Sequence, residues 1–438
     1  MNTTMKAVAL LAAASLAGGA TAQTASKPKA TYWVSADTTS GMGAMSASSM
    51  AAAAMAQAAP GAGAPAMTPS EQPNLGAMVA GSLLQNYAGY GGRGGAVAGA
   101  VGGALSTFGG LGGFGRKKAK ATPAVATAAP SPAPVQANYL RTLSLDLGSS
   151  GSAPAPAADH LPPSGLQAGP ALPLVTPAKA TPAGHGNAHT PGSTERPRGR
   201  MLIYWGCGET APAPIVIDFA TMAAGKAPNL PSISANPGTP PSAGRHTTYG
   251  TWPNERARIS IPANGSLAGE HVVRGNYAPE IRFALDGAHD FMAPLNTTTA
   301  PLASGATRVN WGAVPGATGY FAQLIGSNGA EDMVFWSSSS VPASMSNLMD
   351  WLPPAEVKRL IGSRAVMPPS QTECVVPSAV VKAVPVGMLQ MIAYGDEANF
   401  AYPPKPANPK TPWNPEWTAK VRFKSTTSAM LGAPGLGS

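Results

Sequence analysis

The chain has 438 residues and a formal net charge of +9, and its 51 glycines and 46 prolines are accompanied by long alanine tracts. Such a composition cannot bury a core along the whole length, so we expect the folded part to be smaller than the length suggests. Residues 1–200 carry 13 Lys and Arg against 5 Asp and Glu, a net charge of +8, whereas residues 201–438 carry 16 against 15, a net charge of +1. The basic charge belongs to the first part, which has no aromatic-and-basic nucleic-acid module. Its predicted partners are therefore anionic membrane lipids or acidic polysaccharide, and not nucleic acid.

The N-terminus has the pattern of a secretory signal peptide. Lys6 precedes an apolar block that runs from Ala7 to Ala17, and Ala20 and Ala22 place small residues at the −3 and −1 positions of a cleavage site. The block is much shorter than the roughly 20 residues that a membrane-spanning helix needs. We therefore expect residues 1–22 to be a signal peptide, and the protein to be exported to the periplasm, the outer membrane or the extracellular space.

The next two segments are of low complexity. Residues 23–73 are rich in Ala, Ser and Met and are predicted to be disordered. Residues 74–121 are apolar and glycine-rich and end in a basic cluster at 116–120. Glycines recur there at every fourth position: Gly91, Gly95, Gly99 and Gly103. This spacing resembles the glycine-zipper segments of some envelope proteins, in which helix backbones approach closely. A flexible tether is the alternative, because each glycine within a helix costs about 1 kcal/mol relative to alanine.

Residues 122–200 form a predicted Pro/Ala linker that contains one strand. In the segment 139–147 apolar residues alternate, with Tyr139, Leu143, Leu145 and Leu147 on one face, which is the pattern of a half-buried strand. We expect this strand to cross the linker and join the sheet formed by later residues.

Residues 201–424 have the pattern of an all-β region, in which short runs of β-branched and aromatic residues alternate with turn signals. It could be divided into sub-domains at 201–278 and 279–403. The predicted strands are Met201–Trp205, Ile215–Phe219, Arg256–Ile261, Glu280–Leu285, Thr307–Trp311, Tyr320–Ile325, Met333–Trp336, Val380–Val384, Met388–Tyr394 and Ala419–Phe423. One helix is predicted over Pro354–Ile361, because prolines precede it and Gly362 follows it. Residues 425–438 are predicted to be a flexible tail.

The segment Val309–Leu324 resembles the second and third strands of a fibronectin type III domain. Trp311 ends one strand, a Pro-Gly-Ala turn begins at Pro315, and Tyr320 opens the next strand. The resemblance covers at most residues 280–400 and implies a seven-stranded sandwich with a spacer or binding role, without catalytic residues. The helix near Pro354 departs from that pattern. The sequence thus predicts a mainly β protein, a divergent immunoglobulin- or fibronectin III-like β-sandwich preceded by a long disordered arm.

The two cysteines, Cys207 and Cys374, are candidates for a disulfide, because an exported chain with an even number of cysteines favours pairing. The closed loop would be long, and the chain-entropy model then gives roughly 5 kcal/mol of stabilisation as an upper figure. Two buried, unpaired cysteines are the alternative.

Candidate chemistry is sparse, since the usual nucleophile, metalloprotease and nucleotide-binding motifs do not occur. The best acid/base candidates are the pair Glu270–His271 and the cluster of Asp286, His289 and Asp290, although a solvated loop also explains that cluster. His185 and His189 are four residues apart but lie in the linker, which argues against a metal site. Three tryptophans in proline-rich surroundings are candidate sugar-stacking platforms or packing residues: Trp252, Trp413 and Trp417.

These observations favour an exported cell-envelope protein with a non-enzymatic binding or structural role. One alternative is a carbohydrate-active enzyme, or its binding accessory, that uses Asp286, His289 and Asp290. The other is a membrane-inserting assembly driven by the glycine-zipper segment. We expect no cofactor and no metal ion in any of the three.

Overall fold

The computed structural model describes residues 27–44, 139–177, 199–223, 233–257, 259–328, 332–342, 347–384, 386–408 and 410–432. The fold is mainly β, as predicted. Its strands are β1 (Ala30–Gly41), β2 (Tyr139–Ser149), β3 (Ala158–Leu161), β4 (Leu172–Pro173), β5 (Arg200–Trp205), β6 (Ile215–Asp218), β7 (Thr248–Trp252), β8 (Gly269–Gly275), β9 (Ile281–Leu285), β10 (Thr297–Pro301), β11 (Thr307–Trp311), β12 (Gly319–Ser327), β13 (Met333–Ser337), β14 (Glu373–Val376), β15 (Val386–Tyr402) and β16 (Trp417–Leu431). The helices are α4 (Phe219–Ala223), α5 (Pro354–Gly362) and α6 (Ser378–Ala383), with 3₁₀ turns η1 (Ser164–Leu166) and η2 (Asn347–Met349).

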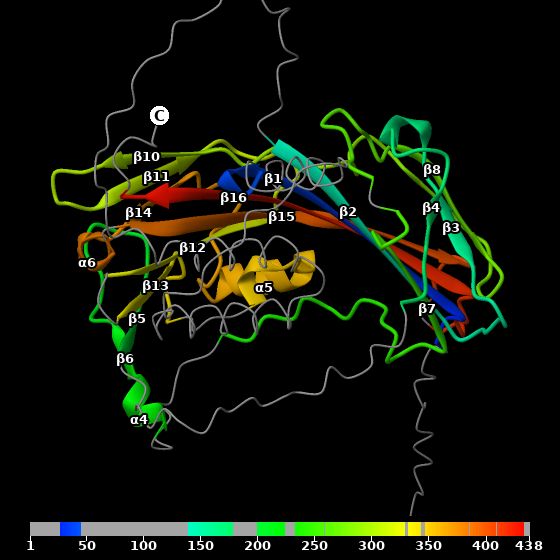
Figure 1. The fold of residues 1–438 in the computed structure, drawn as a ribbon, viewed down its shortest axis with the longest axis horizontal. Helices are drawn as coiled ribbons and strands as arrows, with labels where there is room; N and C mark the ends of the chain where they lie inside the picture. Colours follow the sequence, from blue (N-terminus) through cyan, green and yellow to red (C-terminus); the bar gives the residue numbers. More distant parts are fainter. Residues whose placement is uncertain are drawn as a thin grey trace, which may run out of the picture.

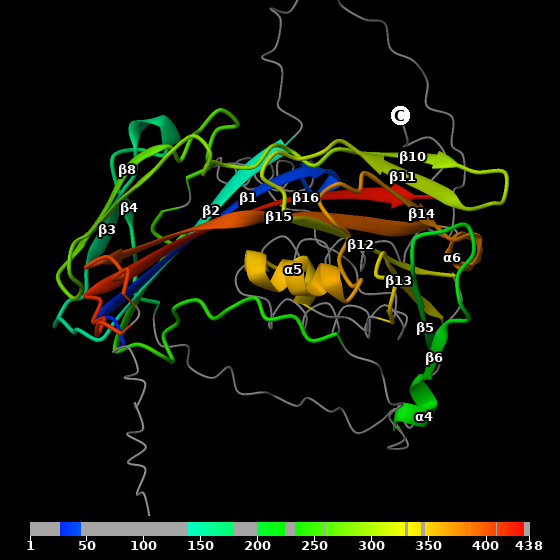
Figure 2. The same cartoon turned by 180° about the vertical axis from the view of Figure 1, so that it is seen from behind.

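A nine-stranded sheet with the order β6-β5-β13-β12-β15-β16-β1-β2-β7 forms the body of the molecule. Two small sheets, β10-β11-β14 and β4-β3-β8-β9, lie over opposite ends of its long strands, and α5 lies on the other face (Figures 1 and 2). The face under the small sheets carries the main core, and the face under α5 carries a second apolar cluster that includes Phe321, Ile392 and Tyr394. We call these the core face and the polar face, because β1 and β16 place mostly polar side chains, among them Ser35, Asp37 and Arg422, on the second face.

Strand β1 lies in the middle of the large sheet. It pairs in parallel with β16, from Ala30 opposite Trp417 to Gly41 opposite Ser428, and antiparallel with β2 on its other side. The prediction that residues 23–73 are disordered is therefore wrong for Ala30–Gly41. Within this strand Tyr32, Val34 and Ala36 alternate into the core, but the Ala, Ser and Gly composition of the surrounding window concealed so short a pattern.

The position of β1 also corrects the prediction of a long arm that precedes the folded part. Because Ser40 pairs with Tyr139, the chain between β1 and β2 leaves and re-enters the sheet at neighbouring positions. The predicted glycine-zipper residues and the signal peptide lie outside the described residues. The segment that contains Gly91–Gly103 is thus an insertion between two paired strands, joined to the scaffold at both of its ends.

Four other predictions differ from the structure. Within the predicted linker, residues 158–161 form β3 and residues 172–173 form β4, and Leu166, Leu172 and Leu174 are buried in the main core. The predicted tail is wrong up to Leu431, since β16 continues through Ser and Thr residues whose hydroxyls are bonded within the fold, as Ser425 is to the amide of Leu295.

The segments Val380–Val384 and Arg256–Ile261 are not strands. The first falls in α6, which starts after Pro377. Part of the second forms only isolated bridges, made by Ala257 and Ile261. Short apolar runs of this kind do not distinguish a strand from a buried helix. The helix predicted over Pro354–Ile361 is confirmed, with a proline at its first position.

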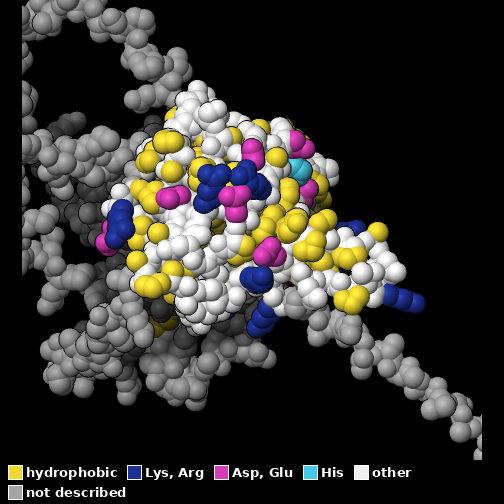
Figure 3. Space-filling model, turned by 90° about the vertical axis from the view of Figure 1, so that its right-hand side faces the viewer, with side chains coloured by type: hydrophobic (Ala, Val, Ile, Leu, Met, Phe, Trp, Pro, Cys, Tyr) yellow, Lys and Arg dark blue, Asp and Glu magenta, His cyan; other side chains and the backbone are white. Residues whose placement is uncertain are grey.

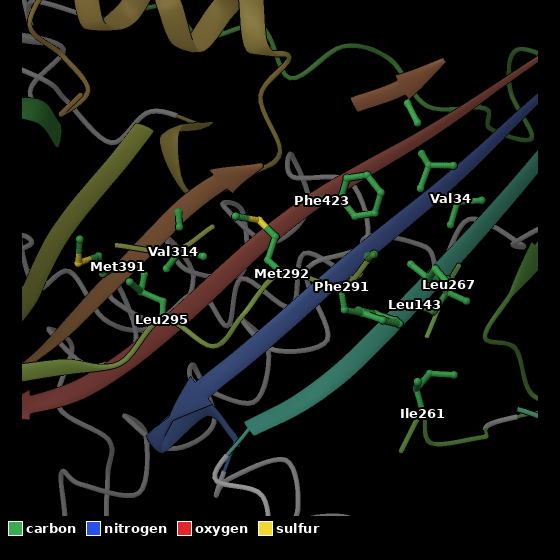
Figure 4. Packing of buried hydrophobic residues seen from close by; sticks show 14 of the residues in the cluster. Val34, Leu143, Ile261, Leu267, Phe291, Met292, Leu295, Val314, Met391 and Phe423 are labelled. Atoms are coloured by element: carbon green, nitrogen blue, oxygen red, sulfur yellow. The ribbon is translucent and has the colours of Figure 1, made fainter. Parts of the chain in front are cut away.

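The segment between β9 and β10 crosses the core face of β1 and β16. Phe291, Met292 and Leu295 pack against side chains of these strands, among them Val34 and Phe423 (Figure 4). Two hydroxyls of β1 fix its backbone, because Thr38 donates to the carbonyl of Met292 and Ser40 to that of Leu295. The connection thereby becomes part of the core.

A charge on the core face of β1 should unfold the protein more readily than the same charge on the polar face. Val34 is 1 % exposed, so Val34→Asp buries an unpaired carboxylate, and we expect it to lower the free energy of unfolding by about 3–5 kcal/mol. Thr31→Asp, a half-buried position of the same strand, should lower it by about 1 kcal/mol or less. Urea unfolding of both variants measures this, and equal losses would contradict the placement of β1.

Candidate functional site

The predicted pair Glu270–His271 is separated by the alternation of β8. Glu270 faces solvent, where its carboxylate accepts a hydrogen bond from Arg282 at 3.0 Å, whereas His271 is fully buried on the other face. Successive side chains of a strand point to opposite faces. The two groups therefore do not form an acid/base pair.

The predicted cluster after β9 is divided between solvent and structure. Asp286 and His289 form an exposed pair, with Oδ1 and Nδ1 2.8 Å apart, and the hydrogen bond to His289 lowers the pKa of Asp286. Asp290 instead points inward, where it accepts hydrogen bonds from the Ser266 hydroxyl at 2.5 Å and the Leu267 amide at 2.8 Å. The two carboxylates therefore do not converge on His289.

A buried hydrogen-bond network of Tyr32, His160 and His271 connects β1, β3 and β8. Its central member, His160, lies in the segment that the sequence analysis predicts to be a linker. The Nε2 of His271 donates to the carbonyl of Leu267 at 2.7 Å, so its Nδ1 must accept. The Nε2 of His160 is the donor to it at 3.2 Å, which leaves His160 Nδ1 to accept from the hydroxyl of Tyr32 at 2.9 Å. All the donors and acceptors of this network are satisfied only when both imidazoles are neutral.

Burial keeps the three side chains of this network uncharged. Desolvation lowers the pKa of His160 well below its usual range, and it also lowers the pKa of His271, against which the Leu267 carbonyl and Asp290 act in the opposite direction. Burial likewise raises the pKa of Tyr32. The network is thus a neutral connection between the four-stranded sheet and the large sheet.

Of the three tryptophans singled out as sugar-stacking candidates, the structure leaves one in contact with solvent. Trp252 and Trp417 are buried in the core, whereas Trp413 is half-buried in the loop that connects β15 to β16. At the start of that loop Tyr402 is 56 % exposed, and its ring stacks on Trp417 with centroids 6.3 Å apart. Sequence reasoning missed Tyr402, although its place before two prolines at a strand end was a signal.

The loop 403–416 holds Trp413 near Tyr402. The indole Nε1 of Trp413 donates to the carbonyl of Pro403 at 3.0 Å, and the ammonium of Lys405 lies over the Trp413 ring at 5.9 Å. We call Tyr402 together with this loop the hairpin tip. Figure 3 looks onto the end of the molecule at which β15 passes into β16, and hydrophobic side chains are exposed there between groups of charged ones.

The hairpin tip is basic, because the start of β1 adjoins it. Lys29 forms an ion pair with Glu416 at 3.2 Å, and the amide of Ala30 donates to the Glu416 carbonyl. Residues 27–29 and 403–416 together contain four lysines and one glutamate, which gives a net charge of +3. An exposed tyrosine ring, a half-buried indole and a surplus of lysines are groups that can contact the ring faces and the acidic groups of a polysaccharide.

The predicted disulfide is confirmed. Cys207, after β5, is bonded to Cys374 in β14, across a sequence separation of 167 residues. It connects the large sheet to the three-stranded sheet. Among the described residues, no three His, Cys, Asp or Glu side chains are grouped as a metal ion would need. None of the described helices has the length and apolar composition of a membrane-spanning helix. His185 and His189 lie outside the described residues.

Comparison with known proteins adds no family assignment. No family model matches the chain, and the search of curated proteins gives no significant match.

The buried histidines should make the protein less stable in acid. Their pKa values are lower in the folded state than the usual 6.5, so below about pH 6.5 the unfolded chain binds protons that the folded chain does not. The two neutral histidines make their full contribution to the free energy of unfolding above that pH. This contribution is lost as the pH falls, by up to about 2.7 kcal/mol per pH unit for the two groups. Urea unfolding at several pH values between 7.5 and 4.5 measures the slope.

The control is a pair of variants that separates these histidines from other titrating groups. His160→Gln/His271→Gln should remove most of the acid slope, whereas Lys358→Gln, at an exposed position of α5, should keep it. A slope unchanged in the double variant would show that other groups cause the acid sensitivity.

Proposed function

We propose that the protein is an exported, non-enzymatic component of the cell envelope, whose β scaffold contacts acidic polysaccharide through the hairpin tip. The observation that carries this proposal is the exposed Tyr402 beside Trp413 on a surface of net positive charge. Of the sequence-based alternatives, this surface favours the carbohydrate-binding accessory over the carbohydrate-active enzyme. The Asp286, His289 and Asp290 side chains do not converge around a reacting group.

Export is supported by two independent features. The N-terminal pattern is that of a secretory signal peptide, and the Cys207–Cys374 disulfide suits an oxidising compartment outside the cytosol. The compartment that follows is the periplasm, the outer membrane or the extracellular space.

The arrangement of strands supports a divergent fibronectin III-like sandwich as the spacer part of this function. The three strands β10-β11-β14 lie over the large sheet, whose consecutive strands β13-β12-β15-β16 form the facing layer; of these, β16 follows the region 280–400 that carries the resemblance. Trp311 and Tyr320, the residues that carry the resemblance, face each other across the two sheets with ring centroids 5.5 Å apart. Strands β5, β6, β1, β2 and β7 extend the larger sheet beyond that core.

A second role, contact with the membrane, is favoured by the insertion between β1 and β2. The chain leaves the sheet after Gly41 and re-enters it at Tyr139, whereas the hairpin tip lies beside Ala30. The length of β1, about 36 Å at 3.3 Å per residue, separates these two places. The apolar, glycine-rich sequence of 74–121, with its basic end, would then contact anionic lipid at one end of the scaffold while the tip contacts polysaccharide at the other.

Polysaccharide binding should depend on the aromatic residues of the tip. We expect Tyr402→Ala and Trp413→Ala to weaken binding of the mature protein to polygalacturonate by about three- to tenfold each, since such ring contacts contribute about 0.5–1.5 kcal/mol. Added salt should weaken it further, because lysines contribute. Tyr402→Phe keeps the ring and should bind normally, as should Lys358→Ala on α5. Unchanged affinity in both alanine variants would exclude the tip.

Fractionation of cells that produce the full chain tests export and membrane contact together. The mature protein should begin at Gln23 by mass analysis, occur outside the cytosol, and stay with envelope membranes after carbonate washing if residues 74–121 insert. An intact Met1 in the cytosol would contradict export, and complete release by carbonate would contradict insertion only.

A further inference from the structure

The polar face of β16 carries a row of three cations. Lys420, Arg422 and Lys424 alternate along the strand, opposite Trp33, Ser35 and Asp37 of β1, respectively. Arg422 is 4 % exposed and Lys424 is 6 % exposed. This row is separate from the hairpin tip, and buried cations of this kind are rare in proteins unless they are paired.

Two of the three cations have carboxylate partners. The ammonium of Lys420 lies 2.5 Å from Glu397, and that of Lys424 lies 3.6 Å from Asp37. Among the described residues Arg422 has no carboxylate within ion-pair distance, and the only hydrogen bond of its guanidinium runs from Nε to the Ser35 hydroxyl at 2.7 Å. The two Nη groups of a buried guanidinium are thereby left without acceptors in the described part of the chain.

The rings around Arg422 determine which part of the guanidinium a ligand could reach. Its central carbon lies 4.9 Å from the ring centroid of Trp33 and 4.6 Å from that of Trp351, and the ammonium of Lys424 lies 3.7 Å from the Trp351 centroid. Indole rings attract a cation but supply no hydrogen-bond acceptor in its plane. The edge that bears the Nη groups keeps its N–H donors, which in guanidinium match two oxygens of one acid group.

The charges nearby disfavour a doubly charged ligand. Burial lowers the pKa of Arg422, and Asp350, Asp146 and Glu397 counteract this through space, so the guanidinium stays protonated in a mixed electrostatic environment. With Asp37 beside Lys424, four carboxylates surround three cations. A dianionic phosphate would be repelled more strongly than a carboxylate.

We propose that Arg422 binds the carboxylate of a small organic acid, with two N–H groups on the two oxygens, Lys424 as a second positive charge, and Trp33 and Trp351 as apolar walls. The class of ligand is a monoanionic carboxylate that bears an apolar or sugar ring. This site does not depend on the polysaccharide contact at the hairpin tip.

The test is thermal unfolding of the mature protein with glucuronate as the probe, at constant ionic strength maintained with chloride. We expect glucuronate to raise the melting temperature saturably in the wild type, in Arg359→Gln and in Tyr402→Ala, but not in Arg422→Gln. Arg359 is the matched control, because it is an exposed arginine paired with Glu356 on α5. Arg422→Lys should keep the charge and lose most of the effect, since it cannot bind both oxygens.

Should Arg422→Gln not fold, the wild-type protein labelled with ¹⁵N-arginine provides the second measurement. The Nε–H resonance of Arg422 should shift and saturate as glucuronate is added, whereas that of Arg359 should stay in place. The proposal is overturned if the wild type shows no saturable response, if Arg422→Gln responds equally, or if inorganic phosphate stabilises the protein more than glucuronate does.

Discussion

The parallel pairing of β1 with β16 is the contact on which the remaining structure depends. It joins residues that are 387 positions apart along the chain, for example Trp33 and Lys420, and it places both strands in the centre of the large sheet. The entropic cost of closing a loop grows only slowly with loop length, so a separation of this size costs little more than a shorter loop would. The pairing produces the core face, the row of Lys420, Arg422 and Lys424, and the proximity of Lys29 to the hairpin tip.

The same pairing explains which parts of the fold could be predicted from the sequence. Strands β5, β11, β12 and β13 and the helix α5 were found because local periodicity and proline positions define them. Strand β1 was missed because its stability comes from two distant neighbours, and no local signal records them. The segments around His160 and Leu172 were missed for a related reason, because these short segments become strands only by pairing with each other and with the distant β8.

Site residues could be predicted from the sequence only where their neighbours along the chain determine their environment. Trp413 was recognised from its proline-rich surroundings, but the exposure of Tyr402 depends on where β15 ends, and the burial of Trp417 on where β16 begins. The segment Ala419–Phe423 was recognised as a strand from its alternation. Nothing in that alternation indicated that its polar positions would be buried beneath Trp351, because Asp350 and Trp351 come from a segment some seventy residues earlier.

Buried polar groups in this fold follow two different physical solutions. The network of Tyr32, His160 and His271 is neutral, and each donor in it meets an acceptor, so low dielectric strengthens it. The row of Lys420, Arg422 and Lys424 is charged, and its central member relies on aromatic rings and one hydroxyl. A network that is fully satisfied serves to hold two sheets together. One that keeps donors without protein acceptors, as Arg422 does, can bind a ligand whose oxygens accept from them.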